Sequence, residues 1–282
     1  MPGTLFVVAT PIGNLEDITV RALRVLREVA IIAAEDTRRT AQLLSRYAIA
    51  TPTTSLHEHN EARKSPAIVA RLVAGDSVAL VSDAGTPTVS DPGQRLIAAA
   101  IDARIRVEPI PGPSAILAAL AASGAAGDTF AFLGFPPIRS KDRTKWFDRA
   151  RTNGGTIVFF EAPHRIERTF RDLQVAVGDC HVTVARELTK VHEQLVRGPI
   201  SMILDRGLRA QGEFTVVALI GHLTDTTAAD PISPESLLIE FGEMTSSGAI
   251  SRREAINRLA TRHRIAPNEL YAAIELAKKS IT

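Results

Sequence analysis

Residues 82–93 read Ser-Asp-Ala-Gly-Thr-Pro-Thr-Val-Ser-Asp-Pro-Gly, between an apolar run at 77–81 and a stretch of helical pattern at 94–101. This order predicts a strand that ends at Val81, a long loop, and then a helix. A loop rich in Gly, Pro, Ser and Asp leaves backbone N–H groups unpaired at the carboxyl edge of a parallel sheet, where α/β proteins bind ligands. A simple turn with a helix cap is the alternative, but the loop is long for a mere connection. We therefore expect a ligand-binding loop.

Strand-length apolar runs recur on both sides of this loop. In the first half each is followed by turn residues and a helical pattern, and they span 5–9, 30–34, 78–81 and 106–110. This alternation is typical of a parallel sheet built from β-α-β units. In the second half the strand-like runs are 129–133, 156–160, 182–185, 194–196 and 214–220, with helical stretches at 141–151, 165–175 and 200–209. The close spacing of the late strands favours hairpins in a mixed sheet.

Two changes of composition divide the chain into three predicted parts. Large side chains become rare at 121–128, and 223–234 is rich in Thr, Ala, Asp and Pro, as in a linker. We predict an N-terminal α/β domain, a second α/β domain and a helical appendage, with bounds 1–122, 123–224 and 225–282. In the appendage, Ser251 and Glu254 form a capping-box pattern and Pro267 opens a helix. From residue 251 onward it carries seven basic and three acidic residues, so helix packing and RNA contact both stay open.

The composition is that of an ordinary globular protein. Its 282 residues are 45% hydrophobic and 23% charged, with a formal net charge of +2. So small a charge exerts no general attraction on nucleic acid, and any such contact must come from local patches. The single cysteine, Cys180, excludes an internal disulfide and a cysteine-based zinc site, which fits a reducing cytoplasm. The N-terminus does not read as a signal peptide, and prolines and glycines make 109–127 a strand end, a turn and a buried helix instead of a membrane span.

Four further segments lie at predicted strand ends: Thr-Pro-Ile-Gly-Asn-Leu at 10–15, Pro-Gly-Pro-Ser-Ala at 111–115, Glu-Ala-Pro-His-Arg at 161–165 and Ala-Arg-Glu-Leu-Thr-Lys at 185–190. Together with the 82–93 loop and Gly-Glu-Phe-Thr at 212–215, this ordered set resembles the tetrapyrrole methylase superfamily of S-adenosylmethionine-dependent methyltransferases. The resemblance spans about residues 4–222 and continues into the appendage. It implies an α/β protein with two α/β domains of the tetrapyrrole methylase (class III methyltransferase) type and a small C-terminal helical appendage.

The resemblance also implies a cofactor, S-adenosylmethionine, held in the cleft between the two domains, and a homodimer as the functional unit. The residues that it places around the cofactor are Asp83, Ala84, Gly85, Thr86, Pro87, Val89, Ser90, Ser114, Ala115, Phe135, Ala185, Arg186, Leu188, Glu213, Phe214 and Thr215. Glycine and alanine permit close approach of the backbone to the ligand, and serine and threonine offer hydroxyl groups.

One departure from the family pattern indicates the branch. Methylases of porphyrin precursors carry a glycine-rich turn after the first strand, whereas this chain has Thr-Pro-Ile-Gly-Asn at 10–14. The turn resembles that of the RNA-modifying branch, which implies 2′-O-ribose methylation of a cytidine in small-subunit (16S) ribosomal RNA by a cytoplasmic enzyme. Two alternatives stay open: a C-methyltransferase of tetrapyrrole precursors, and a noncatalytic RNA-binding protein of ribosome assembly.

Methylation of a ribose hydroxyl requires alignment with the donor and benefits from a group that accepts the hydroxyl proton. The candidates for this catalytic role are Glu187, Lys190 and Glu193, with His192 beside them. The alternative is a charged surface turn, on which Arg186 and Lys190 could instead hold an RNA phosphate.

A basic segment at 138–154 is the predicted RNA contact. Its side chains could meet phosphates while Trp146 stacks on an unpaired base, although a solvated helix face fits equally well. Arg165 follows Pro163 at the start of a predicted helix, where it could bind an anion or simply cap and pack. The RNA-binding candidates are Arg139, Lys141, Arg143, Lys145 and Arg165. His57 and His59 share a strand face with alternating spacing, but two histidines without a third ligand are weak evidence for a metal, and we predict none.

Overall fold

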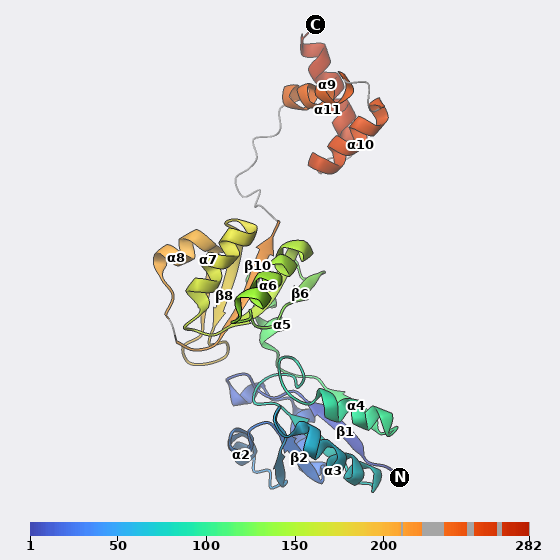
Figure 1. Cartoon of the computed structure of the whole chain (residues 1–282), viewed down its shortest axis with the longest axis vertical. Helices are drawn as coiled ribbons and strands as arrows, with labels where there is room; N and C mark the ends of the chain where they lie inside the picture. The colour runs from blue at the N-terminus through green and yellow to red at the C-terminus, as the bar shows by residue number, and fades with distance from the viewer. Residues whose placement is uncertain (210, 222–233, 247–250, 264–266, 282) are drawn as a thin grey trace. The chain divides into compact units, whose positions relative to one another are not determined.

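The computed structural model describes residues 1–209, 211–221, 234–246, 251–263 and 267–281. The chain divides into two compact units, Met1–Leu223 and Thr224–Thr282, and the first contains two five-stranded sheets. Figure 1 gives the course of the chain and the element labels.

The first sheet is entirely parallel, in the strand order β3-β2-β4-β1-β5. Its strands are β1 (Thr4–Val8), β2 (Ile31–Ala34), β3 (Thr53–Ser55), β4 (Val78–Val81) and β5 (Arg106–Ile110). The four apolar runs predicted in this half are confirmed as β1, β2, β4 and β5. Strand β3 was not predicted, because it is short and its polar residues Thr-Thr-Ser are only half-buried at the edge of the sheet, so they form no apolar run.

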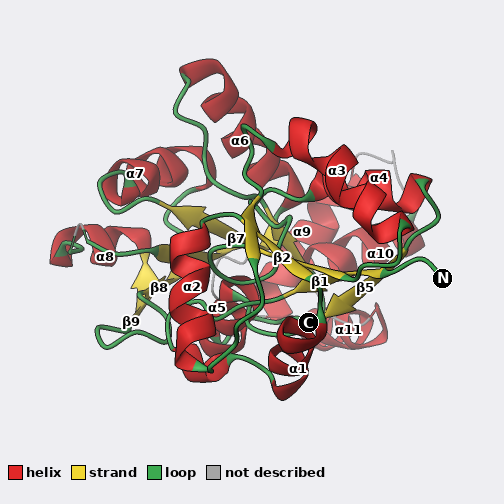
Figure 2. Cartoon of the chain, turned by 90° about the horizontal axis from the view of Figure 1, so that it is seen from below, coloured by secondary structure: helices red, strands yellow, loops and turns green. Residues whose placement is uncertain are grey.

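Two helices cover each face of the first sheet. The core on one face contains residues of α1 (Val20–Glu28) and α2 (Thr37–Arg46), and the core on the other contains residues of α3 (Glu61–Val73) and α4 (Gln94–Asp102). Helices α3 and α4 lie side by side in Figure 2. Strands β2 and β4 are neighbours, yet the helices that follow them lie on opposite faces. Such a switch opens a crevice outside the carboxyl ends of the two strands, the usual ligand position in α/β proteins.

The second sheet is mixed, as predicted, in the order β6-β7-β10-β8-β9. Its strands are β6 (Phe130–Phe132), β7 (Gly155–Glu161), β8 (His181–Arg186), β9 (Gln194–Pro199) and β10 (Phe214–Ile220). Only β6 and β7 pair in parallel, and the other three pairs are antiparallel.

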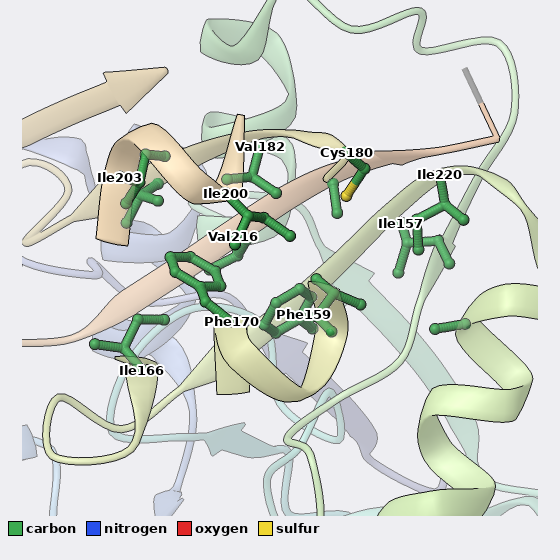
Figure 3. Close-up of a cluster of buried hydrophobic side chains, with 14 of the residues drawn as sticks. Ile157, Phe159, Ile166, Phe170, Cys180, Val182, Ile200, Ile203, Val216 and Ile220 are labelled. Atoms are coloured by element: carbon green, nitrogen blue, oxygen red, sulfur yellow. The ribbon is translucent and has the colours of Figure 1, made fainter. Parts of the chain in front are cut away.

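One face of the second sheet is covered by α6 (Ser140–Asn153), α7 (Ile166–Val177) and α8 (Ile200–Arg206). Figure 3 shows this core, in which Phe159 and Phe170 are completely buried. Helix α8 ends three residues before the predicted end, because Gly207 adopts a φ of +70° that leaves the helical region.

The opposite face of the second sheet is covered by α5 (Ala115–Ser123). Ile116, Ala119 and Leu120 of this helix pack against Val158, Ala185 and Val217 of the sheet. The helix therefore packs with the second sheet, although the predicted boundary at residue 122 assigns it to the first domain. That boundary stays a prediction.

The second unit contains α9 (Pro234–Ser246), α10 (Arg252–His263) and α11 (Pro267–Ile281) around a small core that includes Phe241 and Leu259. The Ser251 hydroxyl accepts a hydrogen bond from the Glu254 backbone N–H at 3.2 Å, which is the cap predicted for α10. The predicted linker up to residue 233 lies outside the described residues, as do 264–266 and the basic side chains of this unit. Among the residues described, no helix combines the length and apolar character needed to cross a membrane.

Candidate active site

A cavity of about 690 Å³ lies in the first unit, between loops of the two sheets. The first sheet contributes the ends of β1 and β5 and the loops that follow β1, β4 and β5. The second sheet contributes Phe135, the end of β7 with residues 161–163, and residues 212–215 at the start of β10. The volume lies within the range usual for pockets that hold small molecules and cofactors.

Most of the predicted cofactor residues line this cavity: Ala84, Gly85, Thr86, Val89, Ser90, Ser114, Ala115, Phe135, Glu213, Phe214 and Thr215. Five predicted residues do not line it: Asp83, Pro87, Ala185, Arg186 and Leu188. Ala185 and Arg186 are buried in β8, where the Arg186 Nε donates a hydrogen bond to the Gln211 carbonyl at 2.6 Å. Arg186 thus holds the segment before residues 212–215, and its contact with the cavity is indirect.

Several lining residues were not named among the predicted cofactor residues, including Ile12, Asp91, Phe160 and Glu161. All four lie at or directly after the carboxyl end of a strand, or in the loop that follows it. Glu161 belongs to the Glu-Ala-Pro-His-Arg motif and Asp91 to the 82–93 loop. The sequence therefore indicated that both segments matter, but it did not show that these two side chains line the cavity.

The 82–93 loop is held at both of its ends. At the first, Thr10 and Gly85 exchange two backbone hydrogen bonds of 2.9 Å, and Gly85 has a φ of +78°. At the second, the buried Glu61 accepts hydrogen bonds through its Oε1 from the N–H groups of Gly93 (3.2 Å), Arg95 (2.7 Å) and Leu96 (3.1 Å). Glu61 therefore caps α4 from another helix and fixes the point where the loop ends.

The middle of the same loop is strained. Thr88 and Ser90 adopt φ values of +73° and +68°, a region that costs a non-glycine residue roughly 1–3 kcal/mol. Such strain persists only where the surrounding structure holds it, and it is concentrated at ligand sites.

The predicted catalytic residues form a network beside the cavity. Lys190 Nζ lies 2.9 Å from Glu187 Oε1 and 3.0 Å from Glu213 Oε2. The Lys190 hydrogen bond lowers the pKa of Glu187. Burial acts to lower the pKa of Lys190, but the hydrogen bonds to Glu187 and Glu213 outweigh it, so the pKa of Lys190 is raised. Near neutral pH the lysine is thus protonated and has no free electron pair, and the lowered pKa makes the ionised Glu187 a weak base, so both are poor proton acceptors.

This network also joins the two halves of the first unit. The Thr189 hydroxyl accepts a hydrogen bond from the Asn14 backbone N–H at 2.9 Å. Glu193 is exposed and accepts from the Thr189 backbone N–H at 2.6 Å. Glu187, Lys190 and Glu193 do not line the cavity, so the geometry favours a role in holding loops together.

Two of the predicted RNA-binding arginines are engaged inside the protein. Arg143 is buried; its Nε lies 2.8 Å from Asp172 Oδ2, and its Nη2 donates to the Thr169 hydroxyl at 2.9 Å. Arg165 Nε lies 3.3 Å from the fully buried carboxylate of Glu161, and its Nη2 donates to the Pro136 carbonyl. Because Arg143 Nη1 also donates to the Pro137 carbonyl at 3.3 Å, the two arginines together hold the segment that carries Phe135 at the cavity.

The interpretation of Trp146 as a base-stacking residue is wrong. Its ring is buried in the core, and its Nε1 donates to the Leu133 carbonyl at 2.8 Å. The prediction that Arg143 contacts RNA is wrong for the same reason, because its guanidinium has little contact with solvent. The remaining candidates, Arg139, Lys141 and Lys145, are exposed at and near the start of α6, and we call them the α6 basic patch.

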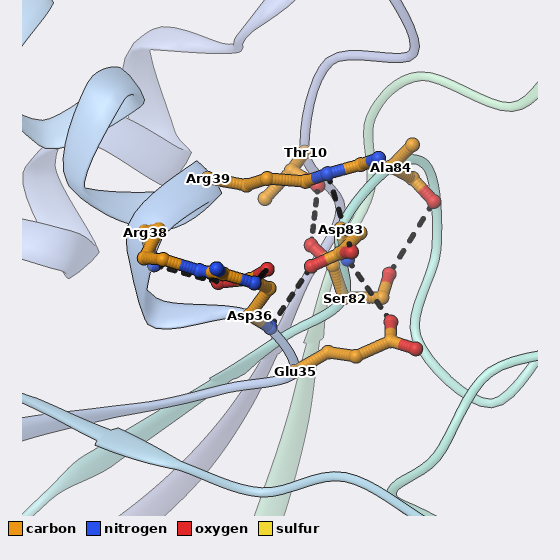
Figure 4. A network of polar contacts seen from close by, with 8 residues as sticks. All are labelled: Thr10, Glu35, Asp36, Arg38, Arg39, Ser82, Asp83 and Ala84. Atoms are coloured by element: carbon orange, nitrogen blue, oxygen red, sulfur yellow. Dashed lines mark hydrogen bonds and ion pairs between the residues drawn. The ribbon is translucent and has the colours of Figure 1, made fainter.

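The crevice between β2 and β4 contains a carboxylate cluster that the sequence prediction missed (Figure 4). Glu35 Oε2 accepts a hydrogen bond from the Asp83 backbone N–H at 3.2 Å, and Asp83 accepts one from the Asp36 N–H at 2.9 Å. Arg39 lies 3.6 Å from Asp83. A side-chain hydrogen bond from Arg38 lowers the pKa of Asp36 to about 2, whereas burial raises the pKa of Glu35.

The paired histidines show no metal geometry. Their ring centroids lie 6.0 Å apart in an edge-to-face contact, and the described part of the chain contains no group of three His, Cys, Asp or Glu side chains placed to hold a metal ion.

Comparison with known proteins adds a family and named relatives. Residues 4–203 match the family model described as Tetrapyrrole (Corrin/Porphyrin) Methylases. A protein of Synechocystis sp. named Ribosomal RNA small subunit methyltransferase I is 42% identical over 95% of this chain and 96% of its own length. A protein of the same name from Mesorhizobium japonicum is 44% identical over 88% of this chain and 85% of its own.

Among solved structures, the uroporphyrin-III C-methyl transferase of Thermus thermophilus complexed with S-adenyl homocysteine shares the fold. Its TM-score is 0.56 and its sequence identity 16%, with 76% of this chain and 97% of that chain covered. At this identity the likeness extends to the fold alone.

Proposed function

The chain belongs to the tetrapyrrole methylase family, and we propose that it methylates small-subunit ribosomal RNA with S-adenosylmethionine as methyl donor. The observation that carries this proposal is the full-length similarity to proteins named ribosomal RNA small subunit methyltransferase I. The cavity at the carboxyl ends of the parallel strands supports it, because that is where an α/β enzyme of this topology binds its cofactor.

The residues around the cavity fit S-adenosylmethionine. When bound, this cofactor supplies an electrophilic methyl group on a positively charged sulfur. Apolar and aromatic side chains such as Ile12 and Phe135 can contact its adenine, and the hydroxyls of Ser114 and Thr215 can bond its polar groups. The carboxylates that line the cavity favour a cationic ligand over an anionic one.

The finer part of the proposal is the acceptor, the 2′-hydroxyl of a cytidine. Its support is the Thr-Pro-Ile-Gly-Asn turn at 10–14, where Ile12 contributes to the cavity and the glycine-rich turn of porphyrin methylases is absent. The α6 basic patch is exposed, as phosphate contacts with RNA require.

We further propose a homodimer in the cytoplasm, with ribosomal RNA or the small ribosomal subunit as its partner. The support for the dimer is the family resemblance, and the support for the location is the presence of the substrate there. Light scattering of the purified full chain tests the dimer: twice the 30.3 kDa chain mass is expected, and a single chain mass contradicts it.

The test of the function is mass spectrometry of nucleosides from small-subunit ribosomal RNA of a strain that lacks this chain. Loss of one 2′-O-methylcytidine, restored by the wild-type gene and not by a Gly85→Val variant, is the expected result. An unchanged pattern of methylation rejects the substrate. Restoration by the Gly85→Val variant would instead favour a noncatalytic role in assembly.

A further inference from the structure

A ribose hydroxyl loses its proton when it is methylated, and the acceptor of that proton is unassigned. Near neutral pH a positioned carboxylate or imidazole is the usual acceptor. Such a group must reach the cavity in which methyl transfer takes place. Among the described residues, the carboxylates that line the cavity are those of Asp91, Glu161 and Glu213.

Two of these three carboxylates are already engaged. Glu161 is buried and accepts from the Ala162 backbone N–H at 2.8 Å and from the Thr169 hydroxyl, with the Arg165 guanidinium 3.3 Å away. Glu213 is paired with the Lys190 ammonium at 3.0 Å. A carboxylate held by a cation is a weaker base, because accepting a proton breaks the ion pair.

Asp91 has different surroundings. It lies in the strained part of the 82–93 loop, next to Ser90, and lines the cavity. The Ser82 hydroxyl donates to the Ala84 carbonyl at 3.4 Å, and the charged groups that act on Asp91 are Glu35 at the end of β2 and Asp83 after β4. Arg39 of α2 pairs with Asp83 at 3.6 Å. No ion pair found among the described residues includes Asp91.

We infer that Asp91 is the catalytic residue that accepts the proton of the attacking ribose hydroxyl, at the junction of the cofactor cavity and the β2–β4 crevice. The inference rests on the proposed function. The hydroxyl oxygen forms a bond to the methyl carbon while the carbon–sulfur bond breaks and leaves its electron pair on the neutral sulfur. The O–H proton passes to Asp91, so one carboxylate and one sulfonium charge disappear together. The cluster around Asp91 thus marks the place of the target ribose.

The electrostatics of the cluster support this role. Burial, and the neighbouring charge of Glu35, raise the pKa of Asp91 to about 6. A carboxylate with this pKa is ionised at neutral pH and is a stronger base than an ordinary aspartate. The pKa of Glu187, by contrast, is lowered by its hydrogen bond with Lys190.

The test compares the full-length wild type with Asp91→Asn, Asp91→Glu and, as a matched control, Asp102→Asn, an exposed aspartate at the end of α4. Single-turnover methyl transfer is measured on small subunits from the deletion strain. Calorimetry gives the affinity for S-adenosylmethionine, and carboxyl ¹³C NMR follows the titration of the aspartates.

For Asp91→Asn we expect a rate about 10²- to 10⁴-fold lower, with cofactor affinity within about threefold of wild type. Asp91→Glu should recover part of the rate, and Asp102→Asn all of it. The aspartate signal that titrates near pH 6 should vanish in Asp91→Asn and in Asp91→Glu and persist in Asp102→Asn.

Two outcomes overturn the inference while leaving the proposed function intact: an Asp91→Asn rate within about threefold of wild type, or a loss of cofactor affinity that accounts for the whole loss of rate. A wild-type protein that transfers no methyl group to the subunits overturns the proposed function and the inference with it.

Discussion

Removal of the Glu61 carboxylate should destabilise the first unit and loosen the cofactor loop. One oxygen of this buried side chain accepts three backbone N–H groups at the start of α4, at 2.7–3.2 Å. In Glu61→Ala the exposed Arg95 amide can bond water, whereas Gly93 and Leu96 are buried. Each buried donor left without a partner costs about 1–3 kcal/mol, so we expect a total loss of about 3 kcal/mol.

The matched variants separate the hydrogen bonds from the charge. Glu61→Gln keeps an acceptor oxygen and loses only the charge–dipole interaction, which costs about 1 kcal/mol. Glu58→Ala, an exposed neighbour, should change nothing. In a unit of this size, these values correspond to falls in Tm of about 6–12 °C for alanine and 2–4 °C for glutamine.

Circular dichroism is the appropriate assay for this series, because the single tryptophan, Trp146, lies in the core of the second sheet and does not report on α4. Hydrogen exchange should show faster exchange at residues 93–96 in Glu61→Ala. The reasoning is refuted if the alanine variant loses less than about 1 kcal/mol, or if it is no less stable than the glutamine variant.

Four further predictions follow from individual contacts. Arg143→Ala removes the buried guanidinium that bonds Thr169 and the part-exposed Asp172, and should cost about 1–3 kcal/mol by Trp146 fluorescence in urea; unchanged stability contradicts its structural role. Because the folded pKa of Glu187 is lowered, its stabilising contribution is present above its ordinary value of 4.5 and is lost as pH falls through the lowered value. Glu187→Gln should therefore lower the Tm more at pH 7 than at pH 2, and an equal fall in Tm at the two pH values would contradict the lowered pKa. Gly85→Val places a branched side chain at a φ of +78° and should weaken S-adenosylmethionine binding at least about tenfold by calorimetry, with unaltered affinity as the contrary result. Alanine at all three positions of the α6 basic patch should weaken RNA binding and reduce its salt dependence, and an unchanged salt slope would place the RNA elsewhere.

The pH dependence of stability gives an independent check on Asp91. Its folded pKa is raised to about 6 from 3.8, so the folded state binds the proton more tightly and loses stability as pH rises through this interval. Asp91→Asn should therefore be more stable than wild type at pH 8 and equal to it at pH 3. The opposite order at pH 8 contradicts the raised pKa.

The strands of the fold could be predicted where burial on both faces requires a continuous run of apolar residues. Val78–Val81 and Phe214–Ile220 are buried on both faces, and both were predicted with their observed bounds. The edge strand Thr53–Ser55 was not, because its partial burial imposes no hydrophobic pattern. The place of α5 on the second sheet was also beyond sequence reasoning, because it depends on tertiary packing.

The candidate site likewise contains features that the sequence predicts and features that depend on tertiary packing. The 82–93 loop could be predicted to line a cavity, since its composition and its place after a strand carry the signal. The burial of Arg143 could not, because a segment rich in Arg and Lys gives no sign of which side chain turns inward to meet Asp172. The crevice cluster was missed because Glu35 and Asp83 are far apart in the sequence and meet only through the order of β2 and β4 in the sheet.

The most direct measurement is transfer of a tritium-labelled methyl group from S-adenosylmethionine to small ribosomal subunits of the deletion strain by the purified full chain. We predict label in 2′-O-methylcytidine of the small-subunit RNA, and none with Gly85→Val. Absence of label above that of heat-denatured protein, or label on a base carbon or nitrogen instead of a ribose oxygen, would contradict the account.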